Sequence, residues 1–204
     1  MQRLVLATGN PDKFMEMVPV IEQYGIEPLA QSTFFDGEVD EDGLSFVENA
    51  LKKARFASAQ SGLPALADDS GLEVASLGGL PGIISARYAA QGRHKPSEEE
   101  NVRQLLQDLE GKPFCERQAR YSCAVVYVAH ERDPMPIIGI GHWYGEILKS
   151  PRTGHGVGYD DVMWIPALLK TVSELPLDEK IRLSHRTEAI HSVMNQLETN
   201  AFYD

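Results

Sequence analysis

The sequence predicts an α/β protein built on a mixed β-sheet. Short apolar runs of strand length, at residues 4–7 and 63–67, end in polar or glycine-containing turns. Longer segments between such runs carry one apolar stripe and begin with capping residues, which is typical of amphipathic helices. Strand-like segments cluster at residues 117–148, so we expect a long mixed sheet with flanking helices.

Composition limits the classes of partner. The chain has 204 residues, 43% hydrophobic and 24% charged, which suits one sizeable domain or two closely packed lobes. Its formal net charge of -11 repels nucleic-acid backbones and anionic membranes. We therefore expect no nucleic-acid polymer and no membrane as partner. A small anion that arrives with its own metal remains compatible with a local basic pocket.

The cysteines and the N-terminus predict the compartment. The two cysteines, Cys115 and Cys123, fall in a region of strand character and match neither a zinc spacing nor a CxxC redox motif. The first residues lack the charged and apolar regions of a signal peptide, and no apolar stretch is long enough to span a bilayer. These features predict a cytoplasmic protein with reduced thiols.

The first strand leads into a helix start. Residues 4–7 run into a glycine-containing turn, and Asn10 and Pro11 are favourable residues for the N-cap and the first position of a helix. A helix N-terminus attracts anions, and Lys13 in this first turn indicates a phosphate partner. An ordinary capped helix with a surface lysine explains the same residues. The P-loop pattern GxxxxGK[ST] is absent from the chain.

A run of acidic residues precedes the second helix. Five of the seven residues 36–42 are acidic, which is typical of a solvated loop. Ser45 and Glu48 have the spacing of a capping box, so we expect a helix to begin here. Lys52 and Lys53 fall on its polar side, where they could reach a phosphate, although we expect them to be solvated.

Two adjacent carboxylates follow the apolar run 63–67. We expect a buried strand that ends at Asp68 and Asp69, with Gly71 permitting a turn, so that both acids lie at the ligand-binding edge of the sheet. Burying adjacent carboxylates is costly without compensation, and Mg²⁺ bound by carboxylates and substrate phosphates supplies it. A polar turn with both acids solvated is the alternative.

The remaining segments complete the sheet and its helices. We expect further strands at residues 26–29, 72–74, 117–129, 136–141, 142–148 and 162–165. We expect a tight loop at residues 78–82 and helices at 85–89, after Ser97 and at 177–180.

The C-terminal third contains two groups of polar residues. Residues 154–160, GHGVGYD, form a glycine-rich loop whose backbone can approach a flat ligand closely, although a surface hairpin turn has the same composition. Ser184 can cap a final helix with His185 and Arg186 in its first turn. These two side chains place donors at a helix N-terminus, or they decorate the surface.

Together and in this order, the motifs resemble the Ham1/RdgB-type inosine triphosphate pyrophosphatases, especially their bacterial branch. The matching stretches are TGNPDK at 8–13, Glu41 with FVENA at 46–50, LADDSGLEV at 66–74, GGLPGIISARYA from 78, GHGVGYD from 154, EK at 179–180 and SHR at 184–186. Each motif alone is weak, whereas the ordered set is specific and covers essentially the whole chain.

The resemblance implies a fold and an activity. The expected fold is a single domain over residues 1–204, with two lobes around a long central mixed sheet and the active site in the cleft between them. The expected reaction is Mg²⁺-dependent hydrolysis of ITP, dITP, XTP or dXTP to the nucleoside monophosphate and pyrophosphate. Members of the family are usually homodimers, so we expect a homodimer here.

The resemblance also assigns roles to residues. Asp69 matches the catalytic acid that activates water, and Glu41, Asp68 and Asp69 match the metal-linked carboxylates. The expected substrate-binding residues are Thr8, Gly9, Asn10, Pro11, Asp12, Lys13, Ser70, Val157, Gly158, Tyr159, Asp160, Lys180, His185 and Arg186.

Two positions depart from the family pattern. The family usually has phenylalanine, which stacks on the base, where this chain has Val157. Because aromatic–base stacking contributes roughly 1–3 kcal/mol, we expect a higher KM or looser base selectivity. The family usually has proline where this chain has Asp161, which adds an acid near the site.

Three other functions compete with this interpretation. A related nucleotide pyrophosphatase would prefer another base, such as a modified pyrimidine, and Val157 leaves this open. A haloacid-dehalogenase-type phosphatase needs a DxD motif, which Asp68-Asp69-Ser70 does not provide. A non-catalytic nucleotide sensor would have no use for the base Asp69.

Overall fold

The computed structural model describes residues 2–37, 39–91, 93–152 and 157–199, and the chain forms two compact units. Unit 1 comprises Met1–Ser70, Cys123–Gly141 and Ser184–Asp204, and unit 2 comprises Gly71–Ser122 and His142–Leu183. Three long strands, β3, β4 and β5, contribute residues to both units.

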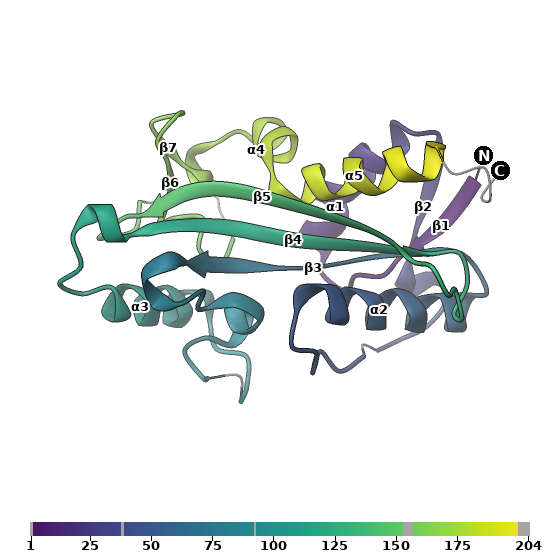
Figure 1. The fold of residues 1–204 in the computed structure, drawn as a ribbon, viewed down its shortest axis with the longest axis horizontal. Coiled ribbons are helices and arrows are strands. Elements are labelled where there is room, and N and C mark those ends of the chain that lie inside the picture. Colours follow the sequence, from purple (N-terminus) through teal and green to yellow (C-terminus); the bar gives the residue numbers. More distant parts are fainter. Residues whose placement is uncertain (1, 38, 92, 153–156, 200–204) are drawn as a thin grey trace. The chain divides into compact units, whose positions relative to one another are not determined.

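The described residues form one seven-stranded sheet with the strand order β2-β1-β3-β4-β5-β6-β7 (Figure 1). The strands are β1 (Gln2–Leu6), β2 (Ile26–Ala30), β3 (Ala65–Val74), β4 (Gln118–Val128), β5 (Ile137–Ile147), β6 (Met163–Ile165) and β7 (Lys170–Thr171). Strand β1 pairs in parallel with β2 and β3, whereas β6 pairs antiparallel with β5 and β7. The mixed sheet confirms the predicted fold class.

The helices begin where the capping residues predict. They are α1 (Pro11–Glu22), α2 (Phe46–Ser61), α3 (Glu98–Asp108), α4 (Leu177–Leu183) and α5 (His185–Thr199). Asn10, Ser45 and Ser97 cap the first three, and the Ser184 hydroxyl accepts the Thr187 N–H at the start of α5. The short helix expected at residues 85–89 is a kinked 3₁₀ segment, Gly82–Arg87.

Small side chains bring α2 onto the sheet in unit 1. Ala50, Ala54 and Ala57 of α2 are fully buried in a cluster with residues of β1, β3 and β4, among them Val5 and Val126. Helices α1 and α5 contact each other, and Figure 1 shows them on the opposite face of these strands from α2. Strand β3, which lies between β1 and β4, is therefore covered by helices on both faces and is deeply buried.

Two glycines bring α5 onto β5, and they correct the prediction of two strands at 136–141 and 142–148. A Cβ atom at Gly139 would lie 2.2 Å from the Ala189 carbonyl oxygen, and one at Gly141 would lie 2.0 Å from that of His185. No side chain fits in these gaps. The glycines therefore serve the close approach of a helix, and β5 continues through both of them.

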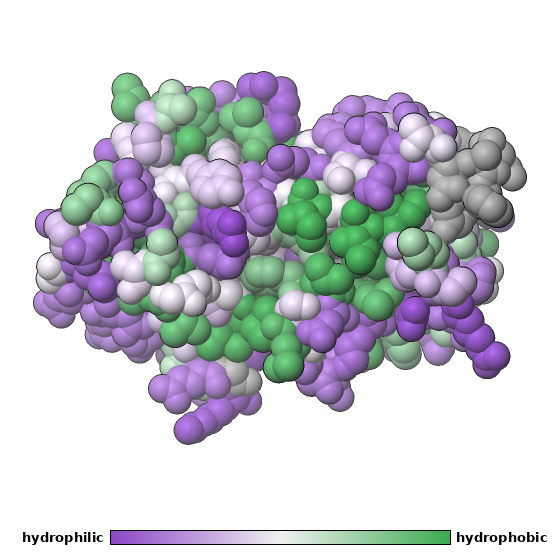
Figure 2. Space-filling view, viewed as in Figure 1, coloured by the Kyte–Doolittle hydropathy of each residue, from purple (hydrophilic) through white to green (hydrophobic). Residues whose placement is uncertain are grey.

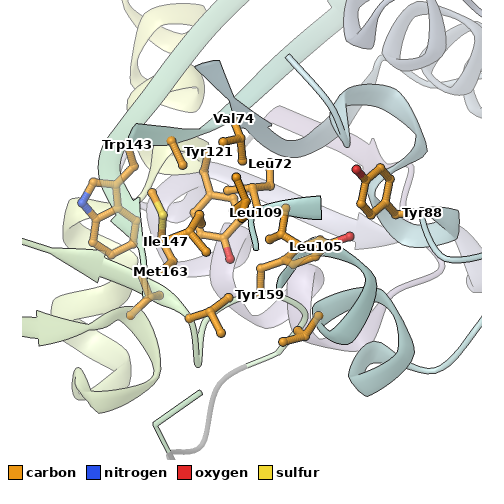
Figure 3. Close-up of a cluster of buried hydrophobic side chains, with 14 of the residues drawn as sticks. Leu72, Val74, Tyr88, Leu105, Leu109, Tyr121, Trp143, Ile147, Tyr159 and Met163 are labelled. Atoms are coloured by element: carbon orange, nitrogen blue, oxygen red, sulfur yellow. The ribbon is translucent and has the colours of Figure 1, made fainter. Parts of the chain in front are cut away.

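Unit 2 has its own aromatic core, shown in Figure 3. The rings of Tyr121, Trp143 and Tyr159 lie among aliphatic side chains, and each residue is less than a tenth exposed. The Tyr159 hydroxyl donates to the Ser85 carbonyl at 2.8 Å, and the Tyr121 hydroxyl donates to Asp160 at 2.9 Å. Both hydroxyls thus find acceptors inside the core, as buried tyrosines require.

In the view of Figure 2, the surface is largely hydrophilic but not uniformly so. Figure 2 shows hydrophobic side chains gathered on the face where Figure 1 draws the long strands. In unit 1, Ile138 and Ile140 of β5 are 40% and 45% exposed. Within the described residues, no helix has both the length and the apolar character that crossing a membrane would need.

The cysteines lie in different environments. Both are free thiols, Cys115 exposed and Cys123 buried. Cys123 lies in β4 as expected, whereas Cys115 lies in a 3₁₀ turn, Phe114–Glu116, outside the strand.

Candidate active site

The acid pair lies in the middle of β3. The strand runs through Asp68, Asp69, Ser70 and Gly71 to Val74, so the expectation that it ends at the acids with a turn at Gly71 is wrong. Successive side chains of a strand point to opposite faces of the sheet. The two carboxylates therefore separate, Asp68 toward residues of α1 and α5 and Asp69 toward residues of α2.

Asp68 is neutralised by two cations. Its Oδ2 lies 2.7 Å from Lys13 Nζ and 3.2 Å from Arg186 Nε, and it accepts the Ser70 hydroxyl at 3.3 Å. The side chain is 1% exposed, and burial alone would raise its pKa. The charges of Lys13 and Arg186 outweigh burial and hold the pKa of Asp68 far below its ordinary value, so Asp68 is ionised in the folded protein.

Arg186 is fixed by three protein partners. Nε donates to Asp68, Nη1 to Glu16 of α1, and Nη2 to the Ser70 hydroxyl at 3.2 Å. Burial acts to lower the pKa of Arg186, but Asp68 and Glu16 outweigh it and hold that pKa above the ordinary value. The alternative of a surface side chain is therefore excluded, since Arg186 is 8% exposed. His185 beside it is also 8% exposed.

Asp69 has a different environment. Its Oδ2 accepts the side-chain N–H of Asn49 at 3.0 Å, and its Oδ1 lies 3.6 Å from Lys53 Nζ. Burial raises the pKa of Asp69 above its ordinary value, although Lys53, Lys13 and the Asn49 hydrogen bond act in the opposite direction. A raised pKa brings a carboxylate closer to neutral pH, where a general base is most effective.

Lys53 joins Asp69 to the acidic segment before α2. Its ammonium lies 2.8 Å from Glu41 Oε1 as well as 3.6 Å from Asp69, and its side chain is only 17% exposed. Burial opposes protonation of Lys53, but Asp68, Asp69 and Glu41 together raise its pKa. The expectation that Lys53 is solvated is therefore wrong. Asn49 and Lys53 are four residues apart and therefore share one helix face. This spacing is the sequence signal from which their common approach to Asp69 could have been predicted.

The segment Thr8–Lys13 is organised by Asn10. The Asn10 Oδ1 accepts the N–H groups of Asp12 and Lys13 at 2.9 and 3.3 Å, and the Thr8 hydroxyl accepts the Asn10 N–H at 3.2 Å. Since Pro11 has no N–H, the side-chain cap takes up the first donors of α1. The structure thus brings Lys13 to Asp68, while Gly9 and Asp12 stay near the surface.

The residues expected around the base lie partly in unit 2. Gly154, His155 and Gly156 lie outside the described residues. Asp160 is 4% exposed and contacts Lys180 Nζ at 2.9 Å, the Tyr121 hydroxyl and the Val157 N–H at 3.2 Å.

The loop residues around Asp160 differ in exposure. Val157 is 37% exposed, and the Gly158 N–H donates to Glu98 Oε2 at 2.9 Å. The Tyr159 ring is buried in the unit 2 core, where burial raises its pKa (Figure 3). The ring therefore anchors the loop to the core, whereas the exposed Val157 side chain is available to contact a ligand.

The face of β3 that carries Asp69 has carboxylates suited to a divalent metal ion. The part of the chain that the structure describes contains no group of three His, Cys, Asp or Glu residues placed to hold a metal. Asp69 and Glu41 nevertheless converge on one cation, the Lys53 ammonium. Carboxylate oxygens suit Mg²⁺, which usually takes only one or two of them and completes its shell with phosphates and water. The donors of Asp69 and Glu41 thus fit this ion.

The mixed sheet and its helices define an α/β protein. Its paired acids, Asp68 and Asp69, form a charged cluster with Lys13, Lys53 and Arg186. The Ham1 family model matches residues 4–196, and the chain belongs to this family.

Relatives are similar over nearly the whole chain. The dITP/XTP pyrophosphatase of Vibrio parahaemolyticus is 47% identical over 197 residues, 97% of each chain, and that of Yersinia pseudotuberculosis is 44% identical over 97% of this chain and 98% of its own. A Ham1 protein structure from Coxiella burnetii has a TM-score of 0.88 at 38% identity, covering 98% and 100% of the two chains. The nucleoside-triphosphatase / dITP/XTP pyrophosphatase structure from Mycobacterium abscessus has a TM-score of 0.75 at 33% identity, covering 94% and 98%.

The two acids should differ in their effect on stability. Asp68→Asn leaves Lys13 and Arg186 with an uncompensated buried charge, so we expect it to lower the free energy of unfolding at pH 7 by roughly 3 kcal/mol. Asp69→Asn removes a carboxylate that burial disfavours and keeps its shape, so we expect a loss below about 1 kcal/mol. Urea denaturation of both variants measures this.

The pH dependence gives a control. Because the folded-state pKa of Asp68 is depressed, its contribution is present above the ordinary carboxyl pKa of about 4 and is lost as the pH falls through the folded-state value. The difference between wild type and Asp68→Asn should therefore shrink below about pH 4. Equal stability of the two variants at pH 7 would contradict the assigned roles.

Proposed function

We propose that this protein hydrolyses non-standard purine nucleoside triphosphates, dITP/ITP and XTP/dXTP, to the monophosphate and pyrophosphate in a Mg²⁺-dependent reaction. The observation that carries the proposal is the buried Asp69 carboxylate, held by Asn49 and facing Lys53. Relatives that are 47% and 44% identical over 97% of the chain are named dITP/XTP pyrophosphatases, which supports the enzyme class and the substrate class.

Asp69 serves as the general base. Attack of water on the α-phosphorus requires a group that takes the proton of the water as the P–O bond forms. Asp69 is the ionisable acid of the pair with a raised pKa, whereas Asp68 remains ionised beside its two cations. Proton transfer to Asp69 is therefore favoured over transfer to Asp68.

Lys13 and Lys53 stabilise the phosphates. Lys13 is 23% exposed on its side chain and shares Asp68 with the more buried Arg186. When Lys13 turns to a phosphate, Asp68 keeps its contact with Arg186, so its buried carboxylate is not left without a cation. Lys53 adds a second cation beside the base. These charges oppose the negative charge that develops on the departing pyrophosphate.

Asp69 and Glu41 are the residues we propose to hold Mg²⁺, with Asp68 as the further predicted ligand. When bound, the ion neutralises phosphate oxygens and favours departure of pyrophosphate. We also propose that the enzyme is cytoplasmic. Its two free thiols are consistent with this compartment, where cysteines stay reduced.

We propose that hydrogen-bond donors of the site select the base by binding the 6-keto oxygen of hypoxanthine or xanthine. Adenine carries an amino group at this position, which would leave a buried donor unpaired, and such mismatches can cost orders of magnitude in specificity. Asp160 and Lys180, which form an ion pair in unit 2, and the exposed Val157 are the residues that the family resemblance assigns to this recognition.

A substrate panel tests the proposal. With Mg²⁺ the wild type should release pyrophosphate from ITP, dITP and XTP with a kcat/KM roughly 10²-fold or more above that for ATP. Excess EDTA should abolish release and added Mg²⁺ should restore it. Asp69→Asn should lower kcat by roughly 10²–10⁴-fold and still bind ITP in calorimetry.

The outcomes separate the alternatives. Preference for a modified pyrimidine triphosphate would identify a different pyrophosphatase, and ITP binding without turnover would identify a sensor. Asp69→Asn that keeps more than about a tenth of the wild-type kcat would exclude Asp69 as the base.

Val157→Phe tests base stacking. A phenyl ring at this exposed position adds stacking on the base that is equal in ground and transition states, so we expect KM for ITP to fall by roughly tenfold with little change in kcat. Val157→Leu is the matched control, because it adds bulk without a ring. An unchanged or raised KM in Val157→Phe would mean that another side chain already stacks on the base.

We also propose that the protein is a homodimer and that Ile138 and Ile140 of β5 contact the second copy. These side chains alternate with the glycines that face α5, and they are the exposed hydrophobic pair of this strand in unit 1. Ile140→Glu should shift the mass in light scattering toward the monomer, whereas Met15→Glu, which changes an exposed methionine of α1, should not. A monomeric wild type would overturn the dimer, and a dimeric Ile140→Glu would overturn this surface.

A further inference from the structure

We propose that Asn49 is a positioning residue that orients Asp69 for catalysis: its amide holds Asp69 Oδ2, so that Oδ1 is the oxygen that takes the proton of the attacking water. This inference rests on the proposed function, in which Asp69 is the general base. Asn49 does not belong to the residues that the motifs assign to substrate or metal.

The contacts of Asn49 use both ends of its amide. The side chain is buried, with the residue 2% exposed. Its Nδ2 donates to Asp69 Oδ2 at 3.0 Å, and its Oδ1 accepts the Gly43 N–H at 2.8 Å. Because an amide has a fixed donor end and acceptor end, the Gly43 N–H determines which end faces Asp69. The donor therefore points to the carboxylate.

The second oxygen of Asp69 is left for the reaction. Lys53, one helical turn after Asn49, brings its ammonium 3.6 Å from Asp69 Oδ1, which is longer than a hydrogen bond. Among the described residues, no protein donor hydrogen-bonds to this oxygen. Asn49 thus occupies Oδ2 and fixes the plane of the carboxylate, while Oδ1 remains able to accept a proton beside a cation.

Gly43 ties the segment that carries Glu41 to the same amide. A Cβ atom at Gly43 would lie 2.6 Å from Asn49 Oδ1 and 2.8 Å from Glu48 Cβ, so the backbone lies directly against the first turn of α2. Glu41 two residues earlier contacts Lys53. One buried amide therefore holds both Asp69 and the segment whose carboxylate shares the Lys53 ammonium with it.

Helix α3 offers a matched comparison within the same chain. Asn101 follows its N-cap Ser97 by four residues, as Asn49 follows Ser45, and it is 5% exposed. Its Oδ1 also accepts a loop N–H, that of Ala89 at 2.9 Å, but its Nδ2 donates to a backbone carbonyl, that of Ala86 at 3.3 Å. The two asparagines tether loops alike, and they differ in that only Asn49 reaches a titratable side chain.

Three variants test the proposal by steady-state ITP hydrolysis and thermal unfolding. Asn49→Ala should lower kcat by roughly 10²-fold, the loss typical of a reacting group displaced by about 1 Å, with KM changed less than about threefold. Asn49→Asp keeps the volume and the acceptor for Gly43 but replaces the donor, so kcat should fall at least as far. Asn101→Ala should lower the Tm and leave kcat within about twofold of wild type.

A double-mutant cycle separates positioning from folding. If Asn49 acts through Asp69, Asn49→Ala in the Asp69→Asn background should cause no further loss of kcat. The inference is overturned if the two losses multiply, if Asn49→Asp keeps more than about half of the wild-type kcat, or if Asn101→Ala loses as much kcat as Asn49→Ala. Failure of the proposed function would instead appear as a wild type that does not hydrolyse ITP.

Discussion

The electrostatic balance of unit 1 depends on the alternation of side chains along β3. Two adjacent aspartates inside a protein repel strongly, and one shared cation would be the simplest remedy. Alternation gives each acid its own partners: Lys13 and Arg186 for Asp68, and Asn49 and Lys53 for Asp69. Two chemically identical neighbours thereby acquire pKa shifts of opposite direction. Such divergence is how one site keeps one acid ionised and makes its neighbour a base.

The sequence was sufficient where the physics is local. Caps at Asn10, Ser45 and Ser97 placed three helix starts, and apolar runs placed most strands. The acid pair could be singled out because adjacent carboxylates after an apolar run demand compensation. What compensates them could not be read from the sequence, since Arg186 lies 118 residues from Asp68 and approaches it only when α5 packs in the fold.

The wrong predictions share one physical cause. Gly71 was interpreted as a turn because glycine permits turns, and residues 136–148 were divided into two strands after Gly141. Strands β3 and β5 continue through these positions, and at Gly139 and Gly141 the missing side chain makes room for the backbone of α5. The prediction that Lys53 is solvated failed for a related reason. A lysine on a polar helix face is solvated unless another element covers it, and here the segment with Glu41 contacts it. Tertiary packing decides both cases.

The two faces of β3 differ in their charge balance, which bears on where a further cation is stable. On the Asp68 side, Asp68 and Glu16 are balanced by Lys13 and Arg186. On the Asp69 side, Asp69 and Glu41 share the Lys53 ammonium. A divalent ion carried in by a triphosphate would add positive charge beside these two carboxylates, whereas on the Asp68 side it would compete with two cations that already contact Asp68. The alternation of β3 thus separates a face suited to holding the fold from a face suited to chemistry.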